Sequence, residues 1–318
     1  MNRRIPKAPN RLRIWQQNSH KSKLAQQYIL NTAPPEDWDV IAIQEPWLDQ
    51  FKNARGSSYW RILYPTTHLL DNAPRTRSIL MINTNIATDS YIQLDVPNAD
   101  ITAVRFNGVH GNISLFNIYN DCTHNETLSA LHLYLLANPP FPLDSMLWLG
   151  DFNRHHPLWE SADNHHLNSS EEDLQTMLDL IRDHDMSMAL PSGIPTYESA
   201  IHSWTRPDNV WLSHQALNLL ISCNTEPSIR PINVDHLPIV TCLDMPVLRV
   251  APNLLPDFHN MDIETFNMAL QAKLTNNSPA HMITSMEAFH TKVDQVMAII
   301  QETIQEQILI RKPCPFSK

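Results

Sequence analysis

Between residue 11 and about residue 245, short apolar runs alternate with segments of helical spacing. The runs are four to eight residues long and rich in β-branched and aromatic residues, as is typical of strands. They lie at 11–17, 39–45, 60–65, 77–83, 101–106, 112–119, 146–152, 208–213, 227–232 and 237–243. Helical spacing is found at 21–32, 126–138 and 169–185. Because several successive strands have no helix between them, the pattern predicts a mixed α/β sandwich with antiparallel pairing.

The pattern changes near residue 246. The segment 245–258 holds three prolines and predicts a linker. Apolar residues then recur at helical spacing from Ile263 to Leu274 and from Met286 to Ile308, and we expect Pro313 to end the second helix. The apolar stripe at 282–310 either packs on the main domain or serves a partner or a dimer.

The pattern thus predicts three regions. They are a basic N-terminal tail at 1–10, a domain at 11–245, and a linker with a helical segment at 246–318.

Composition excludes several classes of protein. Of the 318 residues, 42% are hydrophobic, which is enough for a large core, and only 5 are glycines, which excludes a glycine-rich phosphate loop. The 4 cysteines form no Cys-x-x-Cys pair, so they indicate neither a disulfide framework nor a zinc ribbon, and they fit a reducing compartment. No apolar run approaches the roughly 18 residues that span a bilayer. We therefore expect an intracellular protein without a membrane segment, with the nucleus as one candidate compartment.

The net charge of −10 argues against a protein that coats nucleic acid through bulk electrostatics. It is compatible with an enzyme that acts on phosphodiesters through an acidic, metal-binding centre. Charge alone does not decide between these classes.

Polar side chains stand at or just beyond the ends of the predicted strands. In α/β folds such positions commonly build the active site. They are Asn18, Glu45, Tyr119, Asp151, Asn153, Asp208, Asp235 and His236. Each also has a structural interpretation, because Asn18 could cap the helix at 21–32 and the others could be turn residues or solvated strand ends. The presence of all these residues together, rather than any one of them, favours an active site.

Six segments carry a family resemblance. They are WQQN (15–18), IQEPW (43–47), NIYND (117–121), LGDFNRHHPLW (149–159), WTRPDNVWLS (204–213) and VDHLPI (234–239). In this order they resemble the endonuclease/exonuclease/phosphatase superfamily, which includes DNase I, and in particular the endonuclease domains of non-LTR retrotransposons. The resemblance implies a DNase I-like, four-layered α/β sandwich with two mixed, mainly antiparallel sheets, followed by a short helical tail. The segment 257–318 loosely resembles the stretch that precedes reverse transcriptase in such elements.

The resemblance also implies a metal site. Glu45 would be the principal ligand, with Asn18 and Asp235 completing or supporting the site. Mg²⁺ prefers carboxylate oxygens and is the ion we expect, with Mn²⁺ as the alternative.

The other site residues would act on the phosphodiester. By resemblance, Asp151 positions or deprotonates the attacking water, and Asn153 orients the water and the phosphate. His236 contacts the scissile phosphate, while Asp208 fixes its tautomer and raises its pKa. Tyr119 donates a hydrogen bond to a phosphate oxygen.

Some positions depart from the family pattern. Val234 stands where relatives often have Ser, and Asn120 follows the Tyr where proline is common. Thr205 matches a family position less securely, and the segment from Thr205 to Asp208 is too short for the hairpin that probes the DNA groove in many relatives. We expect no zinc site at His155–His156 or at His165–His166, since adjacent histidines on an extended loop diverge.

The function that follows is a Mg²⁺-dependent endonuclease that nicks DNA and leaves a 3′ hydroxyl. One alternative is a phosphatase of the same superfamily that acts on a small phosphoester. The other is a catalytically silent remnant that binds nucleic acid or a partner protein.

Overall fold

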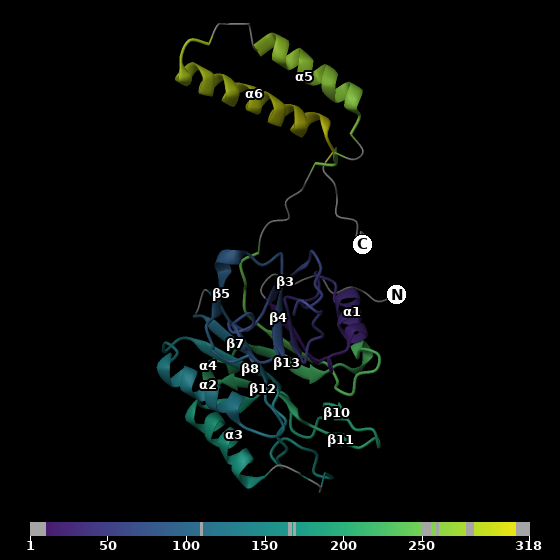
Figure 1. The fold of residues 1–318 in the computed structure, drawn as a ribbon, viewed down its shortest axis with the longest axis vertical. Coiled ribbons are helices and arrows are strands. Elements are labelled where there is room, and N and C mark those ends of the chain that lie inside the picture. The colour runs from purple at the N-terminus through teal and green to yellow at the C-terminus, as the bar shows by residue number, and fades with distance from the viewer. Residues whose placement is uncertain are drawn as a thin grey trace. The chain divides into compact units, whose positions relative to one another are not determined.

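The structure is a computed structural model, and it describes residues 11–108, 111–164, 167, 170–249, 256–258, 261–277 and 283–309 (Figure 1). The basic segment 1–10 and the His165–His166 pair lie outside the described residues. The chain divides into two compact units, Met1–Val250 and Ala251–Lys318.

The first unit contains two six-stranded sheets. In spatial order, the first sheet consists of β13 (Leu220–Thr225), β14 (Ile239–Leu243), β1 (Leu12–Asn18), β2 (Val40–Gln44), β4 (Ser78–Asn83) and β3 (Trp60–Leu63). The second consists of β5 (Tyr91–Leu94), β6 (Ile101–Phe106), β7 (Ile113–Tyr119), β8 (Ser145–Asp151), β12 (Asp208–Ser213) and β9 (Met186–Met188). In each sheet one pair is parallel, β1 with β2 and β7 with β8, and the other pairs are antiparallel. The predicted mixed, mainly antiparallel pairing is confirmed.

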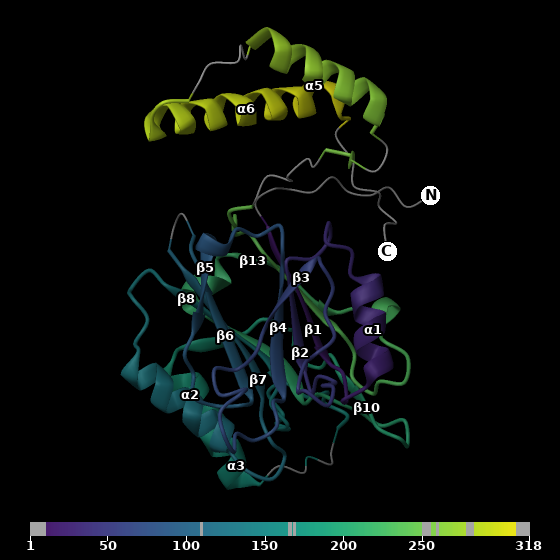
Figure 2. The same cartoon turned by 45° about the horizontal axis from the view of Figure 1, so that its top comes forward.

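Three helices cover the outer faces of the two sheets, namely α1 (Lys23–Thr32), α2 (Glu126–Ala137) and α3 (Glu171–Asp183). The described residues of this unit also form a short helix, α4 (His214–Leu217), whose Ala216 packs in the cluster between the sheets, and 3₁₀ turns at Thr88–Ser90 and Pro227–Ile229. Figure 2 shows α1 on one side of the paired sheets and α2 and α3 on the other. The order helix, sheet, sheet, helix is the predicted four-layered sandwich, and the fold class is confirmed.

Three apolar layers explain this order. Between the sheets, Val40 and Leu80 pack in one cluster with Leu115 and Leu147. Ile29 of α1 packs on the outer face of the first sheet, and Leu131 of α2 is among the residues that pack on the second. The central strands are buried on both faces, which is why VIAI and ILMI lack hydrophobic alternation.

The predicted strand at 227–232 is wrong. Pro227 and Pro231 cannot donate to a β ladder, and Pro227–Ile229 instead forms a 3₁₀ turn with proline at its start. The edge strand lies before them at Leu220–Thr225, where polar and exposed residues such as Asn224 weaken the apolar signal.

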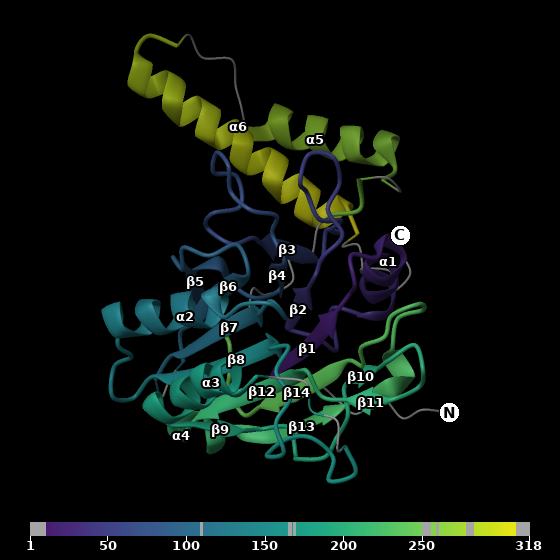
Figure 3. The same ribbon diagram turned by 60° about the horizontal axis from the view of Figure 1, so that its bottom comes forward.

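The segment between Thr205 and Asp208 holds no hairpin, as expected, but a hairpin lies just before it. A two-stranded hairpin, β10 (Tyr197–Glu198) paired with β11 (Trp204–Thr205), precedes Thr205 rather than following it. Glu198 braces it through ion pairs with Arg230 (2.7 Å) and His202 (2.8 Å). Figure 3 shows the hairpin as a projection from the edge of the unit.

The second unit contains two helices, α5 (Ile263–Asn277) and α6 (Met286–Gln307). Ser285 caps α6 by accepting a hydrogen bond from the backbone N–H of Ala288, and Lys273 of α5 lies 2.8 Å from Glu306 of α6. The helix does not continue to Pro313 as predicted, because Ile308 already has an extended backbone. Within the described part of the chain, no helix combines the length and the apolar character needed to cross a membrane.

Candidate active site

The ends of the strands bring the predicted site residues to one rim of the sandwich. Parallel pairing of β1 with β2 sets Asn18 beside Gln44, the residue before Glu45. Parallel pairing of β7 with β8 sets Tyr119 beside Asp151, and antiparallel pairing sets Asp208 on the other side of Asp151. Parallel strands end at the same edge of a sheet, so a site can form there without long loops.

Polar side chains link the two sheets directly beneath this rim. The amide of Gln16 donates to the backbone oxygen of Gly150 at 3.0 Å, and the side chains of Gln44 and Asn117 are hydrogen-bonded to each other. The Asn117 amide also donates to the backbone oxygen of Ile79 at 2.8 Å. Buried amides of this kind cost free energy unless they are paired. They therefore hold the two sheets in one register beneath the site.

Asp151 is the centre of the arrangement. Its side chain is buried, with 2% exposure, and its Oδ2 accepts a hydrogen bond from Asn18 Nδ2 at 2.8 Å. Its Oδ1 accepts one from the backbone N–H of Asn153 at 3.1 Å, while the Asn153 amide donates to the Asn120 backbone oxygen at 2.8 Å. Asn18 therefore supports Asp151 and does not cap α1, whose cap is Ser22.

His236 faces Asp151 from the other side. Its Nε2 lies 4.0 Å from Asp151 Oδ2, and its Nδ1 is hydrogen-bonded to Asp208 Oδ2 at 2.8 Å. The hydroxyl of Thr196 donates to the same Asp208 oxygen at 2.8 Å. The Tyr197 ring lies edge-on to the imidazole, with 4.9 Å between centroids. The Asp208 carboxylate thus holds the orientation of the imidazole.

The pKa values of Asp151 and His236 are both raised, but by different effects. Burial, and then the charge of Asp208, raises the pKa of Asp151 well above its usual range. Burial by itself would lower the pKa of His236, but the carboxylates of Asp208, Asp151 and Asp235 outweigh it and raise the pKa. The imidazole is therefore held as a cation between acidic groups.

Glu45 lies directly after β2 in a left-handed turn, with φ of 48°. Its backbone N–H donates to the Arg77 oxygen at 2.8 Å, and its carboxylate forms an ion pair with Lys21, with 2.7 Å between Oε1 and Nζ. Asn153, His20 and Lys21 also have positive φ. Such strained backbone in non-glycine residues is concentrated at functional sites.

Tyr119 completes the rim from β7. The Arg77 guanidinium lies over its ring, 4.7 Å from the centroid, and is itself held by Asp100 at 2.6 Å and by Asp121. Burial, and then the charges of Glu45 and Asp151, raises the pKa of Tyr119. The phenol therefore keeps its proton and can act as a donor.

Among the described residues, one group of side chains lies close enough together to hold a metal ion. Atoms of Asp151, Asp208 and His236 lie within 4.8 Å of one another, but the Asp208–His236 hydrogen bond already occupies two of them. The predicted set of Glu45, Asn18 and Asp235 offers only oxygen ligands, which suits Mg²⁺. In that set, Asp235 Oδ1 is buried and accepts no hydrogen bond, although it lies 4.0 Å from His236 Nε2, and a cation could coordinate this oxygen. The residues present therefore fit a hard divalent cation.

Thr205, His155 and His156, for which the sequence predicts no firm role in the site, each contact other parts of the protein. Thr205 pairs with Tyr197 across the hairpin, and its backbone oxygen accepts from the N–H of Thr196. His155 is hydrogen-bonded to the buried Glu160 at 2.6 Å, and His156 lies against Trp159. As expected, the two histidines point to different partners.

Sequence reasoning missed several residues that support the site. Thr196 holds Asp208, Lys21 holds Glu45, and Arg77 joins the Glu45 turn to the Tyr119 ring. Each of these supporting residues lies outside the six segments that carry the family resemblance. The available signal was the chemistry of the residue type, such as a lysine three residues after Asn18, and this is weak in a single sequence.

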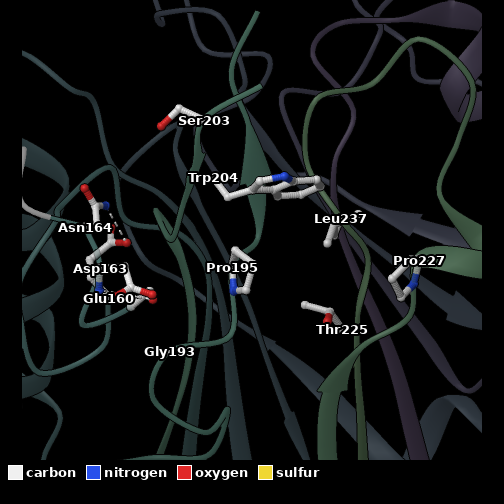
Figure 4. Close-up of a pocket in the computed structure, with 11 residues that line it drawn as sticks. Glu160, Asp163, Asn164, Gly193, Pro195, Ser203, Trp204, Thr225, Pro227 and Leu237 are labelled. Atoms are coloured by element: carbon white, nitrogen blue, oxygen red, sulfur yellow. Dashed lines mark hydrogen bonds between the residues drawn. The ribbon is translucent and has the colours of Figure 1, made fainter. Parts of the chain in front are cut away.

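A cavity of about 650 Å³ lies between the hairpin and the segment that follows His236. Figure 4 shows the indole of Trp204, Pro195 and Leu237 around it. Leu237 directly follows His236, and Trp204 belongs to the hairpin. The Trp204 indole is 40% exposed and has the Arg230 guanidinium 5.9 Å from its centroid. The cavity therefore includes an exposed aromatic side chain of the hairpin, and the hairpin itself contacts the site where Tyr197 pairs with His236.

The predicted resemblance to the endonuclease/exonuclease/phosphatase superfamily agrees with the fold and with a family model that matches part of the chain. A family model described as endonuclease-reverse transcriptase matches residues 113–240. No curated protein matches the sequence.

Several solved structures share the fold. The endonuclease domain of TRAS1, a telomere-specific non-LTR retrotransposon, is 17% identical with a TM-score of 0.59, and the alignment covers 73% of this chain and 98% of that one. The 3′-5′ exonuclease NExo from Neisseria meningitidis is 14% identical with a TM-score of 0.56, covering 72% and 98% of the two chains. The AP endonuclease LMAP from Leishmania major is 12% identical with a TM-score of 0.57, covering 74% and 89%.

Proposed function

We propose that this protein is a Mg²⁺-dependent DNA endonuclease that hydrolyses one phosphodiester and leaves a 3′ hydroxyl, as in retrotransposon-type nicking. The observation that carries the proposal is the buried Asp151 carboxylate, held between Asn18 and the Asp208–His236 pair. The similarity to the TRAS1 endonuclease domain supports DNA as the substrate.

Each side chain has a role that its contacts permit. Asp151 takes the proton of the attacking water, and its raised pKa makes it a stronger base. Asn153 orients the water and the phosphate. The His236 cation and the Tyr119 hydroxyl contact the non-bridging oxygens, where negative charge develops in the transition state.

A divalent cation held by Glu45, Asn18 and Asp235 would neutralise the scissile phosphate and make the attacking water more acidic. The oxygen-only donor set favours Mg²⁺, with Mn²⁺ as a substitute. The protein's own residues fix the geometry: the parallel strand pairs align Asn18 with the Glu45 turn and Tyr119 with Asp151.

The test is conversion of supercoiled plasmid to open circles. We expect nicking with Mg²⁺ or Mn²⁺ and none with EDTA, because the phosphate charge is then uncompensated. DNA ligase should reseal the nicks, which reports a 3′ hydroxyl beside a 5′ phosphate. Phosphate release from small phosphoesters without nicking would identify the phosphatase alternative, and DNA binding that ignores both the metal and Asp151 would identify the silent remnant.

We also predict that DNA stacks on the hairpin. Trp204→Ala should raise KM for DNA about tenfold with kcat little changed, since base–aromatic stacking contributes roughly 1–3 kcal/mol per base. Phe141 is a matched control: it is 66% exposed and also has an arginine, Arg105, over its ring, yet it lies near the start of β8. Steady-state kinetics should show wild-type KM for Phe141→Ala. Equal KM values for the two variants would remove Trp204 from the DNA surface.

A further inference from the structure

Lys21 makes a close ion pair with the proposed metal ligand Glu45. Its Nζ lies 2.7 Å from Glu45 Oε1. The two side chains differ in burial, since Lys21 is 48% exposed and Glu45 only 9%. The ammonium thus approaches a nearly buried carboxylate from the solvent side.

The backbone sets this pair in place. The N–H of Lys21 donates to the Glu45 backbone oxygen at 2.8 Å, and the Ser19 hydroxyl donates to the same oxygen at 2.8 Å. Lys21 and Glu45 both have left-handed backbone conformations, with φ of 55° and 48°. Two strained turns are therefore joined to each other, which distinguishes this pair from a chance contact of long side chains on the surface.

The neighbouring cations are engaged elsewhere. The Arg77 guanidinium is bound by Asp100 and Asp121, and Lys23 lies over the Trp47 ring, 5.0 Å from its centroid. Among the described residues, no other lysine or arginine forms an ion pair with Glu45. Lys21 is thus the cation that neutralises this carboxylate.

We propose that Lys21 is a built-in counter-cation of Glu45 that competes with the divalent metal and so sets the metal affinity of the site. This inference rests on the proposed function, in which Glu45 is a metal ligand. The ammonium and the metal need the same carboxylate oxygen, and two cations near one carboxylate repel each other. Lys21 must therefore release Oε1 when a metal binds there. Its flexible, half-exposed side chain permits this movement.

The proposal is tested by Mn²⁺ titration of the full chain without DNA, with free Mn²⁺ read by electron paramagnetic resonance. Lys21→Met should bind Mn²⁺ about tenfold more tightly, a difference of about 1.36 kcal/mol, because it removes a cation that repels the metal ion. Lys21→Arg keeps the charge and should bind as the wild type does. Glu45→Gln should bind more weakly.

Lys23→Met is the matched control, because it removes the same charge two residues away without touching Glu45. It should shift Mn²⁺ affinity by less than about twofold, since exposed charges are screened. Thermal melting in EDTA checks folding, and Lys21→Met should melt somewhat earlier because Glu45 loses its partner.

Failure of the Lys21 proposal and failure of the metal-site assignment would give different results. If Lys21→Met binds Mn²⁺ as the wild type does or more weakly, while Glu45→Gln weakens binding, then Lys21 is a structural residue and the proposal is overturned with the metal site intact. If Glu45→Gln binds Mn²⁺ normally, Glu45 is not a ligand, and both the proposal and the assigned metal site fail.

Discussion

Asp151→Asn is expected to reduce plasmid nicking by about a thousandfold, since a positioned general base contributes roughly 10²–10⁴ to the rate. The amide keeps the shape of the side chain and can still contact Asn18, but it cannot take a proton from water. The fold should survive, because burial of an uncharged group costs less than burial of a carboxylate. Single-turnover nicking in Mg²⁺, with circular dichroism as the folding check, measures the effect.

Asp144→Asn is the control for this variant. Asp144 is also a buried aspartate and directly precedes β8, but at the opposite end of the strand from Asp151, where it pairs with Arg105. Losing that ion pair should lower stability and leave the nicking rate of the folded protein unchanged. Nicking by Asp151→Asn at a rate comparable with the control would show that the general base lies elsewhere.

Gly150→Ala is expected to destabilise the protein by about 4 kcal/mol or more, among the largest effects that single substitutions produce. Gly150 has φ of 147°, and a Cβ there would lie 1.9 Å from the backbone oxygen of Ile118. That oxygen belongs to the neighbouring parallel strand β7, so it cannot move without separating β7 from β8. Chemical denaturation, or the yield of soluble protein, measures the loss.

Gly193→Ala separates backbone strain from this collision. Gly193 also has positive φ, 82°, but nothing lies within 4 Å of a Cβ at that position. The expected cost is therefore only about 1 to 2 kcal/mol, the strain of a left-handed conformation for an L-residue. If the two alanine variants unfolded at the same denaturant concentration, the close approach of β7 at Gly150 would not be the cause.

The core strands were predictable because their signal is local. Runs such as VIAI at 40–43 are apolar without alternation, and only a strand covered on both faces accommodates that pattern. The prediction failed at 227–232, where apolar residues stand between prolines, and at the edge strand Leu220–Thr225, where half-exposed residues weaken the pattern. Edge strands are specified by the neighbour they pair with, here β14, as much as by their own residues.

The candidate site was also predictable only in part. Order and residue type in the motifs were enough to nominate Asp151, Asp208 and His236. The sequence could not show which carboxylate touches which partner, because Asn18 and Asp151 are 133 residues apart and meet only where the two sheets pack. The same holds for the Gln16 contact with Gly150, which joins those sheets.

By itself, then, the sequence determined the strand-rich sandwich and the kinds of side chain at its rim, since both depend on residues close together in the chain. Only the tertiary structure decided that Asn18 supports Asp151 rather than capping α1, that a hairpin carries Trp204 beside the site, and that Lys21 neutralises Glu45. The physical reason is that these contacts arise from the pairing register of the strands and from left-handed turns. Neither of these features produces a periodic pattern of residues in the sequence.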